Sequence, residues 1–410
     1  MLGGSSPALG LAHRAGGSRT LTFGAGGMDS LELLDKLVAF PTVSLSSNQA
    51  LMGFVRAFLA DLGVEAQEVA GPHPGGSNLY AVVGPSGRGG VALSGHTDVV
   101  PVTGQAWTTD PFRLTRRGDR LYGRGAADMK GFVACTMRAA GLAARRDLKA
   151  PLHLAFSCDE EIGCVGVRPL LERLAAQPTR PLACIVGEPT SMRLATGHKG
   201  KIALRAVCTG RAGHSALAPD LLNAIGMAAE LVQAVGALQD EAAGRGAQNV
   251  GYDIPYATLH VGRIRGGEAL NVVPSRCEVE LEIRSADPAE AEILLRAVRA
   301  AAAAIAGPRR QAFPEADVAV EVTNAYPGLE APRDDPAAAL VRRLLGSNDE
   351  IRLAFGTEGG LYRQALGVPT VVCGPGSMDQ GHKPDEYVTL DQMARCDRMM
   401  EALIDELAAG

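Results

Sequence analysis

Acidic and imidazole side chains follow the short apolar runs of this sequence, at the points where each run stops. They are, in chain order, His96, Asp98, Asp159, Glu160, Glu161, Glu188 and His382, and Asp128 ends the glycine-rich stretch "LYGRGAAD" (121–128). Two imidazoles with several carboxylates are a ligand set that suits zinc, and this set has too many carboxylates for a closed structural site. Because it exceeds what one tetrahedral ion needs, it favours two ions that share a bridging carboxylate. The residue types therefore predict a two-metal hydrolytic site.

The stretch "SCDEEIG" (157–163) places three carboxylates side by side. Crowded carboxylates repel one another and are costly to bury unless solvent or a cation compensates them. The side chains of Glu160 and Glu161 diverge because the residues are adjacent. We expect one of them to bind metal and the other to take a proton from a metal-bound water. Taken alone, a solvated acidic turn is the alternative.

His96 and Asp98 are two residues apart, so in an extended segment their side chains leave on the same side. The Asp98 carboxylate can then accept the second imidazole N–H of His96, as is usual for a metal-bound histidine. A surface or core histidine is the alternative for this motif in isolation.

Near-continuous apolar runs of strand length alternate with helical patterns along the chain. Such runs are typical of strands buried on both faces of an α/β sheet. In open α/β sheets, sites form beyond the carboxyl ends of the strands, which would bring the polar residues above together. The expected strands are 78–84, 90–96, 151–157, 182–188 and 369–374, and the expected helices are 28–44, 50–63, 129–146 and 390–409.

From residue 197 to residue 325 the strands alternate polar and apolar residues, as in a sheet with one solvated face. This change predicts a smaller α+β domain inserted into the first. The first domain would then comprise 28–196 and 326–410.

The bulk composition is that of an ordinary globular protein, with 410 residues, 46% hydrophobic content and a formal charge of −5. Nothing in this balance favours nucleic acid or an anionic membrane surface, so a small-molecule partner is expected. The eight cysteines show no CxxC spacing, which favours reduced core residues in a cytoplasmic protein. No apolar run approaches the roughly 20 residues that span a bilayer.

Residues 1–27 contain no acidic residue and many Gly and Ser. We expect a disordered leader there, or translation begun upstream of Met28, with a targeting presequence as the alternative.

Two motifs resemble those of other enzyme classes but lack a residue that each class requires. "GRGAADMKG" resembles a dinucleotide fingerprint, but Asp128 occupies the third glycine position. "GHSA" is no nucleophile elbow, because Leu217 stands where the second glycine belongs.

Seven motifs, in this order and spacing, resemble the co-catalytic zinc aminoacylase and carboxypeptidase family. They are "SGHTDVVP", "LYGRGAADMKG", "CDEEIG", "GEPTS", "GRAGHSA", "GGEALNVVP" and "GPGSMDQGHKPDEYV". The resemblance covers the chain from Met28 onward. It implies a mixed, mostly parallel α/β catalytic domain of the zinc-peptidase type with an inserted α+β lid and dimerisation domain. It also implies two Zn²⁺ ions, for which Co²⁺ can substitute, and a homodimer.

Carried over residue by residue, the resemblance implies two ion sites bridged by Asp128. His96 and Glu188 would bind one ion, and Glu161 and His382 the other. Glu160 would be the general base and Asp98 would orient His96. Asp159 receives no role.

The resemblance also implies residues that contact substrate. His214, in the inserted domain, would reach the neighbouring subunit's site and stabilise the oxyanion; a turn residue is the alternative. Asn271 and Arg284 would bind the substrate's carboxylate, for which a guanidinium fork is suited. Thr357 and Glu358 are further candidate contacts.

The activity implied is hydrolysis of N-acyl amino acids, in the first place removal of the acetyl group from N-acetylornithine, an arginine-biosynthesis step. Succinyl-diaminopimelate, acetylcitrulline and other N-acyl amino acids or peptides are alternative substrates. Two rival classes are a non-catalytic binder on the same fold and a scaffold that acts through its dimer face.

Overall fold

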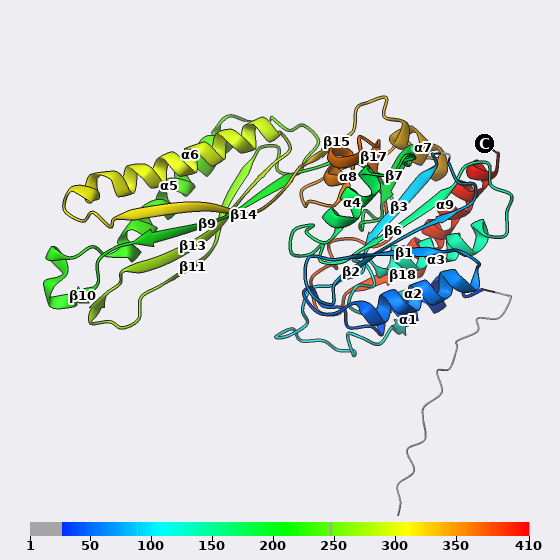
Figure 1. Ribbon diagram of the computed structural model, residues 1–410, viewed down its shortest axis with the longest axis horizontal. Coiled ribbons are helices and arrows are strands. Elements are labelled where there is room, and N and C mark those ends of the chain that lie inside the picture. The colour runs from blue at the N-terminus through cyan, green and yellow to red at the C-terminus, as the bar shows by residue number, and fades with distance from the viewer. Residues whose placement is uncertain (1–26, 88, 247, 410) are drawn as a thin grey trace, which may run out of the picture.

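A nine-stranded mixed sheet lies at the centre of the larger part of the molecule (Figure 1). The computed structural model describes residues 27–87, 89–246 and 248–409, so the predicted leader lies almost entirely outside the described residues. In spatial order the strands are β1 (Ala66–Ala70), β2 (Ser77–Val83), β6 (Leu152–Ser157), β3 (Val91–His96), β7 (Ala183–Val186), β17 (Thr370–Val372), β8 (Leu194–His198) and β15 (Leu329–Glu330), with β16 (Glu350–Leu353) also paired to β8.

Parallel pairing is concentrated in the middle of this sheet. β6, β3, β7 and β17 pair in parallel, whereas β1 and β2 on one flank and β15 on the other pair antiparallel. β3 and β6 are buried along their whole length, as their continuous apolar runs predict. The predicted α/β class is confirmed as a mixed sheet.

Helices cover both faces of the large sheet. One face carries α1 (Ser30–Val38), α2 (Gln49–Asp61), α3 (Lys130–Ala143), α7 (Pro336–Leu345) and α9 (Leu390–Ala409). The other face carries α4 (Val167–Ala175) and α8 (Gly359–Leu366). A small sheet of β4 (Thr115–Arg117), β5 (Arg120–Tyr122) and β18 (Tyr387–Thr389) completes this part, which we call the main unit.

The first helix is shorter than predicted. Asp29 caps it by accepting hydrogen bonds from two backbone N–H groups, and Glu32 closes the capping box. The helix ends at Val38 rather than at residue 44, because Pro41 disfavours helical backbone in the residue before it.

The second part, which we call the inserted unit, contains a separate four-stranded antiparallel sheet with helices on one face (Figure 1). Its strands, in spatial order, are β11 (Thr258–Gly266), β13 (Arg276–Ser285), β9 (Gly200–Thr209) and β14 (Asp317–Tyr326). Its other elements are β10 (Gly213–His214), η1 (Ser215–Asp220), α5 (Ala224–Gly244), β12 (Val272–Val273), α6 (Pro288–Ala306) and η2 (Gly307–Gln311).

Alternate residues of β9 and β13 face the helices and form a separate core, including Leu204, Ala206, Val279 and Leu281. The opposite face of this sheet is polar and open. The chain passes from the large sheet to the four-stranded sheet at Lys199, two residues after the predicted start of the insert. It leaves the four-stranded sheet after Tyr326, the last residue of β14 and one residue past the predicted end.

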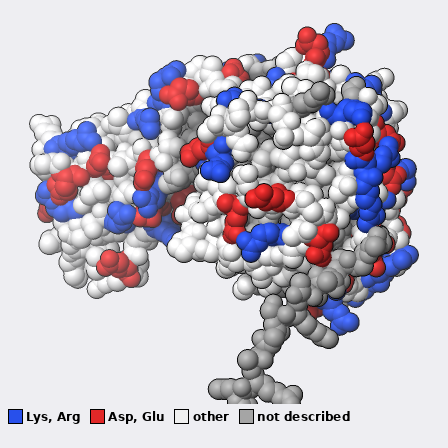
Figure 2. Space-filling model, turned by 45° about the vertical axis from the view of Figure 1, so that its right-hand side comes forward, with Lys and Arg blue, Asp and Glu red and all other residues white. Residues whose placement is uncertain are grey.

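All eight cysteines are buried and free. No helix among the described residues is long and apolar enough to cross a membrane. On the face shown in Figure 2, acidic and basic side chains are interspersed.

Candidate metal centre

The carboxyl ends of β6, β3, β7 and β17 lie at the same edge of the large sheet, since these neighbouring strands are parallel. His96 is the last residue of β3, and Glu160 and Glu161 follow β6. Glu188 follows β7, and His382 lies in the loop after β17. Asp128 precedes α3, which packs against β3 and β6. The sheet therefore gathers side chains that are far apart in sequence.

The Asp128 carboxylate lies between two histidines. Its Oδ1 is 3.1 Å from His96 Nε2, and its Oδ2 is 3.3 Å from His382 Nε2. Glu188 Oε1 lies 3.9 Å from His96 Nε2, and Glu161 Oε2 lies 2.8 Å from His382 Nε2. The five side chains thus form two histidine–carboxylate pairs that share one carboxylate.

These side chains differ in exposure. The side chains of His96, Asp128 and Glu188 are at most 5% exposed, whereas that of His382 is 45% exposed. One side of the cluster is therefore enclosed by the sheet, and the other is open to the surface at His382.

Crowding and burial make several of the carboxyl groups difficult to ionise. Burial, with repulsion from neighbouring carboxylates, raises the pKa of Glu160 to about 8 and that of Glu161 to about 7. The same causes hold the pKa of Glu188 well above its ordinary value. The side chains alone supply too little positive charge for this cluster. Divalent cations would supply it, so the donor set fits metal ions.

The histidines partly offset this crowding. Burial would lower the pKa of His96, but hydrogen bonds to Asp128 and Asp98 hold it well above its usual value. Hydrogen bonds to Asp128 and Glu161 raise the pKa of His382 to about 10. Burial would raise the pKa of Asp128, but contacts with both histidines keep it well below its usual value. Metal binding would have to displace these protons, because imidazole coordinates in its neutral form.

Asp98 supports the turn that carries the two glutamates. Its Oδ1 accepts from the backbone N–H of Glu160 at 3.0 Å, and its Oδ2 accepts from that of Glu161 at 3.3 Å and from the Ser44 hydroxyl at 2.7 Å. The sequence predicts that the Asp98 carboxylate accepts from His96. In the structure His96 Nδ1 lies 3.5 Å from that carboxylate and 2.9 Å from the backbone carbonyl of the same residue. The backbone carbonyl is thus the nearer acceptor for the imidazole.

Asp159, for which the sequence predicts no role, joins two loops beside this turn. Its Oδ1 accepts from the backbone N–H of Leu45 at 2.8 Å, and its Oδ2 lies 2.9 Å from His73 Nε2. Asp159 has a positive φ of 52° and is buried. It therefore holds the start of the turn in place through its contacts with Leu45 and His73.

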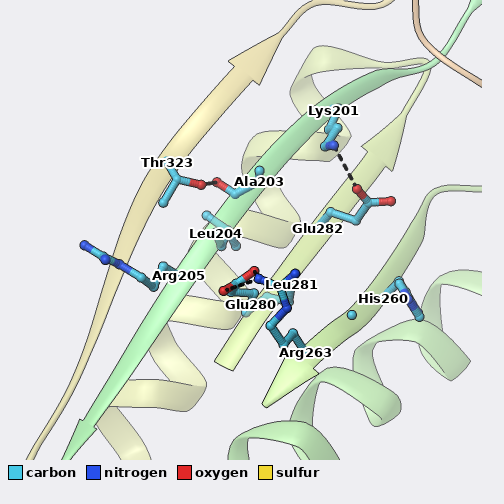
Figure 3. A pocket seen from close by; sticks show the side chains of 11 residues that line it. Lys201, Ala203, Leu204, Arg205, His260, Arg263, Glu280, Leu281, Glu282 and Thr323 are labelled. Atoms are coloured by element: carbon cyan, nitrogen blue, oxygen red, sulfur yellow. Dashed lines mark hydrogen bonds and ion pairs between the residues drawn. The ribbon is translucent and has the colours of Figure 1, made fainter. Parts of the chain in front are cut away.

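A cavity of about 110 Å³ separates the metal cluster from the inserted unit. The cluster forms one wall, and Lys201, Arg284 and Tyr326 of the inserted unit form another. Glu282 pairs with both cations, at 2.7 Å from Arg284 Nε and 3.2 Å from Lys201 Nζ. Figure 3 shows the pair of Lys201 and Glu282 on the open face of the inserted sheet, where the strands line a second cavity of about 540 Å³. Two cations thus share one carboxylate beside the metal cluster.

Sequence comparison identifies the family. A model described as peptidase family M20/M25/M40 matches residues 92–406. The chain belongs to this family. It is 34% identical over 368 residues to acetylornithine deacetylase of Erwinia tasmaniensis, covering 87% of this chain and 92% of that one. Members of the M20/M25/M40 family are metal-dependent, and this chain is a metal-dependent amidohydrolase.

Solved structures share the fold at low identity. The M20 family metallo-carboxypeptidase Sso-CP2 of Sulfolobus solfataricus has a TM-score of 0.72 and 18% identity, covering 93% of this chain and 100% of that chain. The YXEP protein of Bacillus subtilis, described as a dinuclear metal binding peptidase from M20 family, has a TM-score of 0.64 and 18% identity, covering 92% and 97%. The predicted family and fold are confirmed.

Two residues predicted to contact substrate, His214 and Asn271, lie away from the metal cluster of this M20/M25/M40 family member. His214 is on β10, which pairs with β12, and the carbonyl of Asn271 accepts from Ser215 N at 3.0 Å. Figure 1 places β10 at the end of the inserted unit remote from β3 and β6. His214 Nδ1 accepts from Ala216 N at 3.1 Å and caps η1. Within one chain, the structure does not bring these residues to the centre.

Thr357 and Glu358 lie beside the site but do not line its cavity. Thr357 Oγ1 accepts from Gly359 N at 3.0 Å, and Glu358 accepts from the Ser157 hydroxyl at 2.6 Å and from the Ser94 hydroxyl at 3.3 Å. Both residues are at most 1% exposed. Both side chains are therefore held by hydrogen bonds beneath the site, and their contact with substrate stays a prediction.

Glu386 belongs to the site region, although the sequence motifs predict no role for it. It accepts from the backbone N–H groups of Ala127 and Asp128 at 2.9 and 3.0 Å, and it pairs with Arg124 at 2.6 Å. Both charged side chains are 1% exposed. The pair therefore joins the Asp128 segment to the loop that bears His382. Its place in "PDEYV", four residues after that histidine, was the available signal.

The turn that bears the two glutamates is also bonded to the inserted unit. Asn324 Nδ2 donates to the carbonyl of Gly163 at 2.8 Å. Arg168 Nη2 donates to Asn324 Oδ1 at 2.9 Å and to the carbonyl of Ala325 at 2.6 Å. The end of β14 is thus tied to the catalytic edge of the main unit.

Proposed function

We propose that this enzyme hydrolyses the amide bond of N-acyl amino acids and that its principal substrate is N-acetylornithine, giving ornithine and acetate for arginine biosynthesis. The observation that carries this proposal is the position of Glu160, half-buried beside two histidine–carboxylate pairs that share Asp128. The identity to acetylornithine deacetylase supports the substrate.

We assign His96 and Glu188 to one Zn²⁺ and Glu161 and His382 to a second, with Asp128 between them and Co²⁺ able to substitute. When bound, such ions would lower the pKa of a water molecule and polarise the amide carbonyl. Glu160 accepts the proton of the attacking water, for which a raised pKa suits it, and returns that proton to the leaving amine. Asp98 holds Glu160 and Glu161 in register through their backbone N–H groups.

Arg284 binds the carboxylate of the amino acid from the wall facing the cluster. His214 and Asn271 act on the site of a second subunit, so the enzyme works as a homodimer in which the inserted unit, for which the sequence predicts the bounds 197–325, is the lid and dimerisation domain. Their distance from the cluster in their own chain supports this arrangement. The eight buried free cysteines support a reducing compartment, the cytoplasm.

One observation favours a second candidate substrate. Lys201 and Arg284 provide two positive charges against the single carboxylate of Glu282. A substrate with an additional carboxylate, such as N-succinyl-diaminopimelate, would use the remaining charge. Desuccinylation is therefore the second candidate function.

The test measures free amine released from N-acetylornithine and from N-succinyl-diaminopimelate, with Zn²⁺, with Co²⁺ and with chelator. We expect higher kcat/KM for N-acetylornithine and loss of activity with chelator, restored by either ion. Higher kcat/KM for the succinyl substrate would select the second candidate.

Glu160→Gln is the matched variant for the mechanism. It keeps the shape and removes the proton acceptor, so we expect kcat to fall by about 10²-fold or more while bound metal stays unchanged. Near-wild-type turnover by this variant would refute Glu160 as the base.

A further inference from the structure

A buried thiol contacts the proposed general base. Cys164 Sγ lies 3.1 Å from Glu160 Oε1, within hydrogen-bonding distance for sulfur. Cys164 is 1% exposed. Burial, with the nearby Glu160 charge adding to it, holds the pKa of the Cys164 thiol well above its usual value. The sulfur therefore retains its hydrogen and acts as the donor to the carboxylate.

The backbone of the turn brings this thiol back over the base. The N–H groups of Gly163 and Cys164 both donate to the carbonyl of Glu160, at 2.8 and 2.7 Å. Gly163 and Cys164 both have positive φ, of 106° and 55°. A cysteine rarely adopts this left-handed conformation, and such positions persist only where the surrounding contacts enforce them. Here the left-handed conformation of Gly163 and Cys164 reverses the chain direction in the turn.

The position of Cys164 is fixed from outside the turn as well. Arg168 Nε donates to the carbonyl of Cys164 at 3.3 Å, and Arg168 is itself bonded to Asn324. The carbonyl of the preceding Gly163 accepts from Asn324. Hydrogen bonds therefore fix the backbone from which the Cys164 sulfur contacts the Glu160 carboxylate.

We infer that Cys164 is a positioning residue for Glu160: its S–H holds one carboxylate oxygen so that the other oxygen faces the attacking water. This inference rests on the proposed role of Glu160 as base. An oriented carboxylate matters because proton transfer requires the acceptor oxygen within hydrogen-bond reach of the water, and small misplacements are costly.

The test compares Cys164→Ala with Cys164→Ser, each assayed for kcat, KM, bound metal and unfolding temperature. The alanine variant removes the donor, and we expect kcat to fall about 10-fold, with KM and metal content within twofold of wild type. The serine variant keeps an O–H donor at the same position, so we expect its kcat within about threefold of wild type. Cys184→Ala is the matched control, since Cys184 is also fully buried, on β7, and its loss should leave kcat unchanged.

Two results would overturn the inference. One is wild-type kcat in Cys164→Ala. The other is an equal loss in the alanine and serine variants that follows a lowered unfolding temperature, which would show a packing role only. Glu160→Gln separates this inference from the proposed function: if Glu160→Gln is inactive while Cys164→Ala is unaffected, only the positioning role fails.

Discussion

His153 is a buried histidine that the catalytic chemistry does not use. It lies on β6 with Nδ1 2.5 Å from the Tyr80 hydroxyl, and its Nε2 finds no hydrogen-bond partner among the described residues. Burial lowers the pKa of His153 to about 4, from 6.5 for an unperturbed histidine. Between pH 6.5 and pH 4, His153 is protonated in the unfolded chain and neutral in the folded chain. The unfolding free energy therefore falls as pH falls from 6.5 towards 4. Above pH 6.5 His153 causes no such loss.

We predict that His153→Gln reduces the loss of unfolding free energy between pH 7 and pH 5 by about 2 kcal/mol. Urea unfolding at the two pH values measures it. His260→Gln is the control, because His260 is exposed on the inserted unit and should leave the difference unchanged. An equal pH effect in His153→Gln and wild type would show that His153 is protonated in the folded protein.

Among individual residues, those at strand ends could be predicted and those that depend on the path of a loop could not. His96 and Glu188 follow apolar runs directly, so their place at one sheet edge follows from parallel pairing. The contacts of Glu386 and Cys164 depend on loops whose course no periodicity encodes. Asp98 shows the same limit, since its spacing from His96 indicated proximity but not which oxygen would face the ring.

At the scale of elements, the close packing of β7 on α3 determines where Glu188 lies. Gly187 follows β7, and a Cβ atom there would lie 1.9 Å from Phe132 Cγ on α3. Any side chain at this position must push the strand end away from the helix. The absence of a side chain at Gly187 therefore brings Glu188 close to the rest of the cluster.

We predict that Gly187→Ala lowers the unfolding free energy by about 2 kcal/mol, as expected for overpacking, and weakens metal binding. Urea unfolding and chelator competition measure the two effects. Gly141→Ala on α3 is the control: a Cβ atom there would lie 4.0 Å from Leu62 Cδ1, so stability should be unchanged or up to about 1 kcal/mol higher. Equal stability of both variants would contradict the close packing.

Elements with strong apolar patterns were predictable, whereas short edge strands were not. β3, β6 and α9 carry long uniform patterns, and the structure contains them at the expected positions. β15 and β16 are short and owe their conformation to pairing with β8, which tertiary contact decides. The early end of α1 shows that a proline after the helix outweighs the apolar pattern.

At the scale of the whole molecule, the position of His214 makes the proposed dimer testable without a structure. If the partner subunit's His214 completes each site, one site needs Glu160 from one chain and His214 from the other. A heterodimer of Glu160→Gln and His214→Ala chains then holds one intact site and one doubly defective site.

We predict that such heterodimers, made by co-expression with two different tags and purified on both, show about half the activity of wild-type dimers. Each mutant homodimer should be nearly inactive. Heterodimers as inactive as the homodimers would place His214 outside the partner's site.

The bonds between Asn324, Gly163 and Arg168 have a mechanical consequence. They join the last residues of β14 to the segment that bears Glu160, so the inserted unit cannot rotate away from the main unit independently of that segment. Rotation must either break these bonds or displace the base from its working position. Product escape and restoration of the active geometry would then be two stages of a single movement.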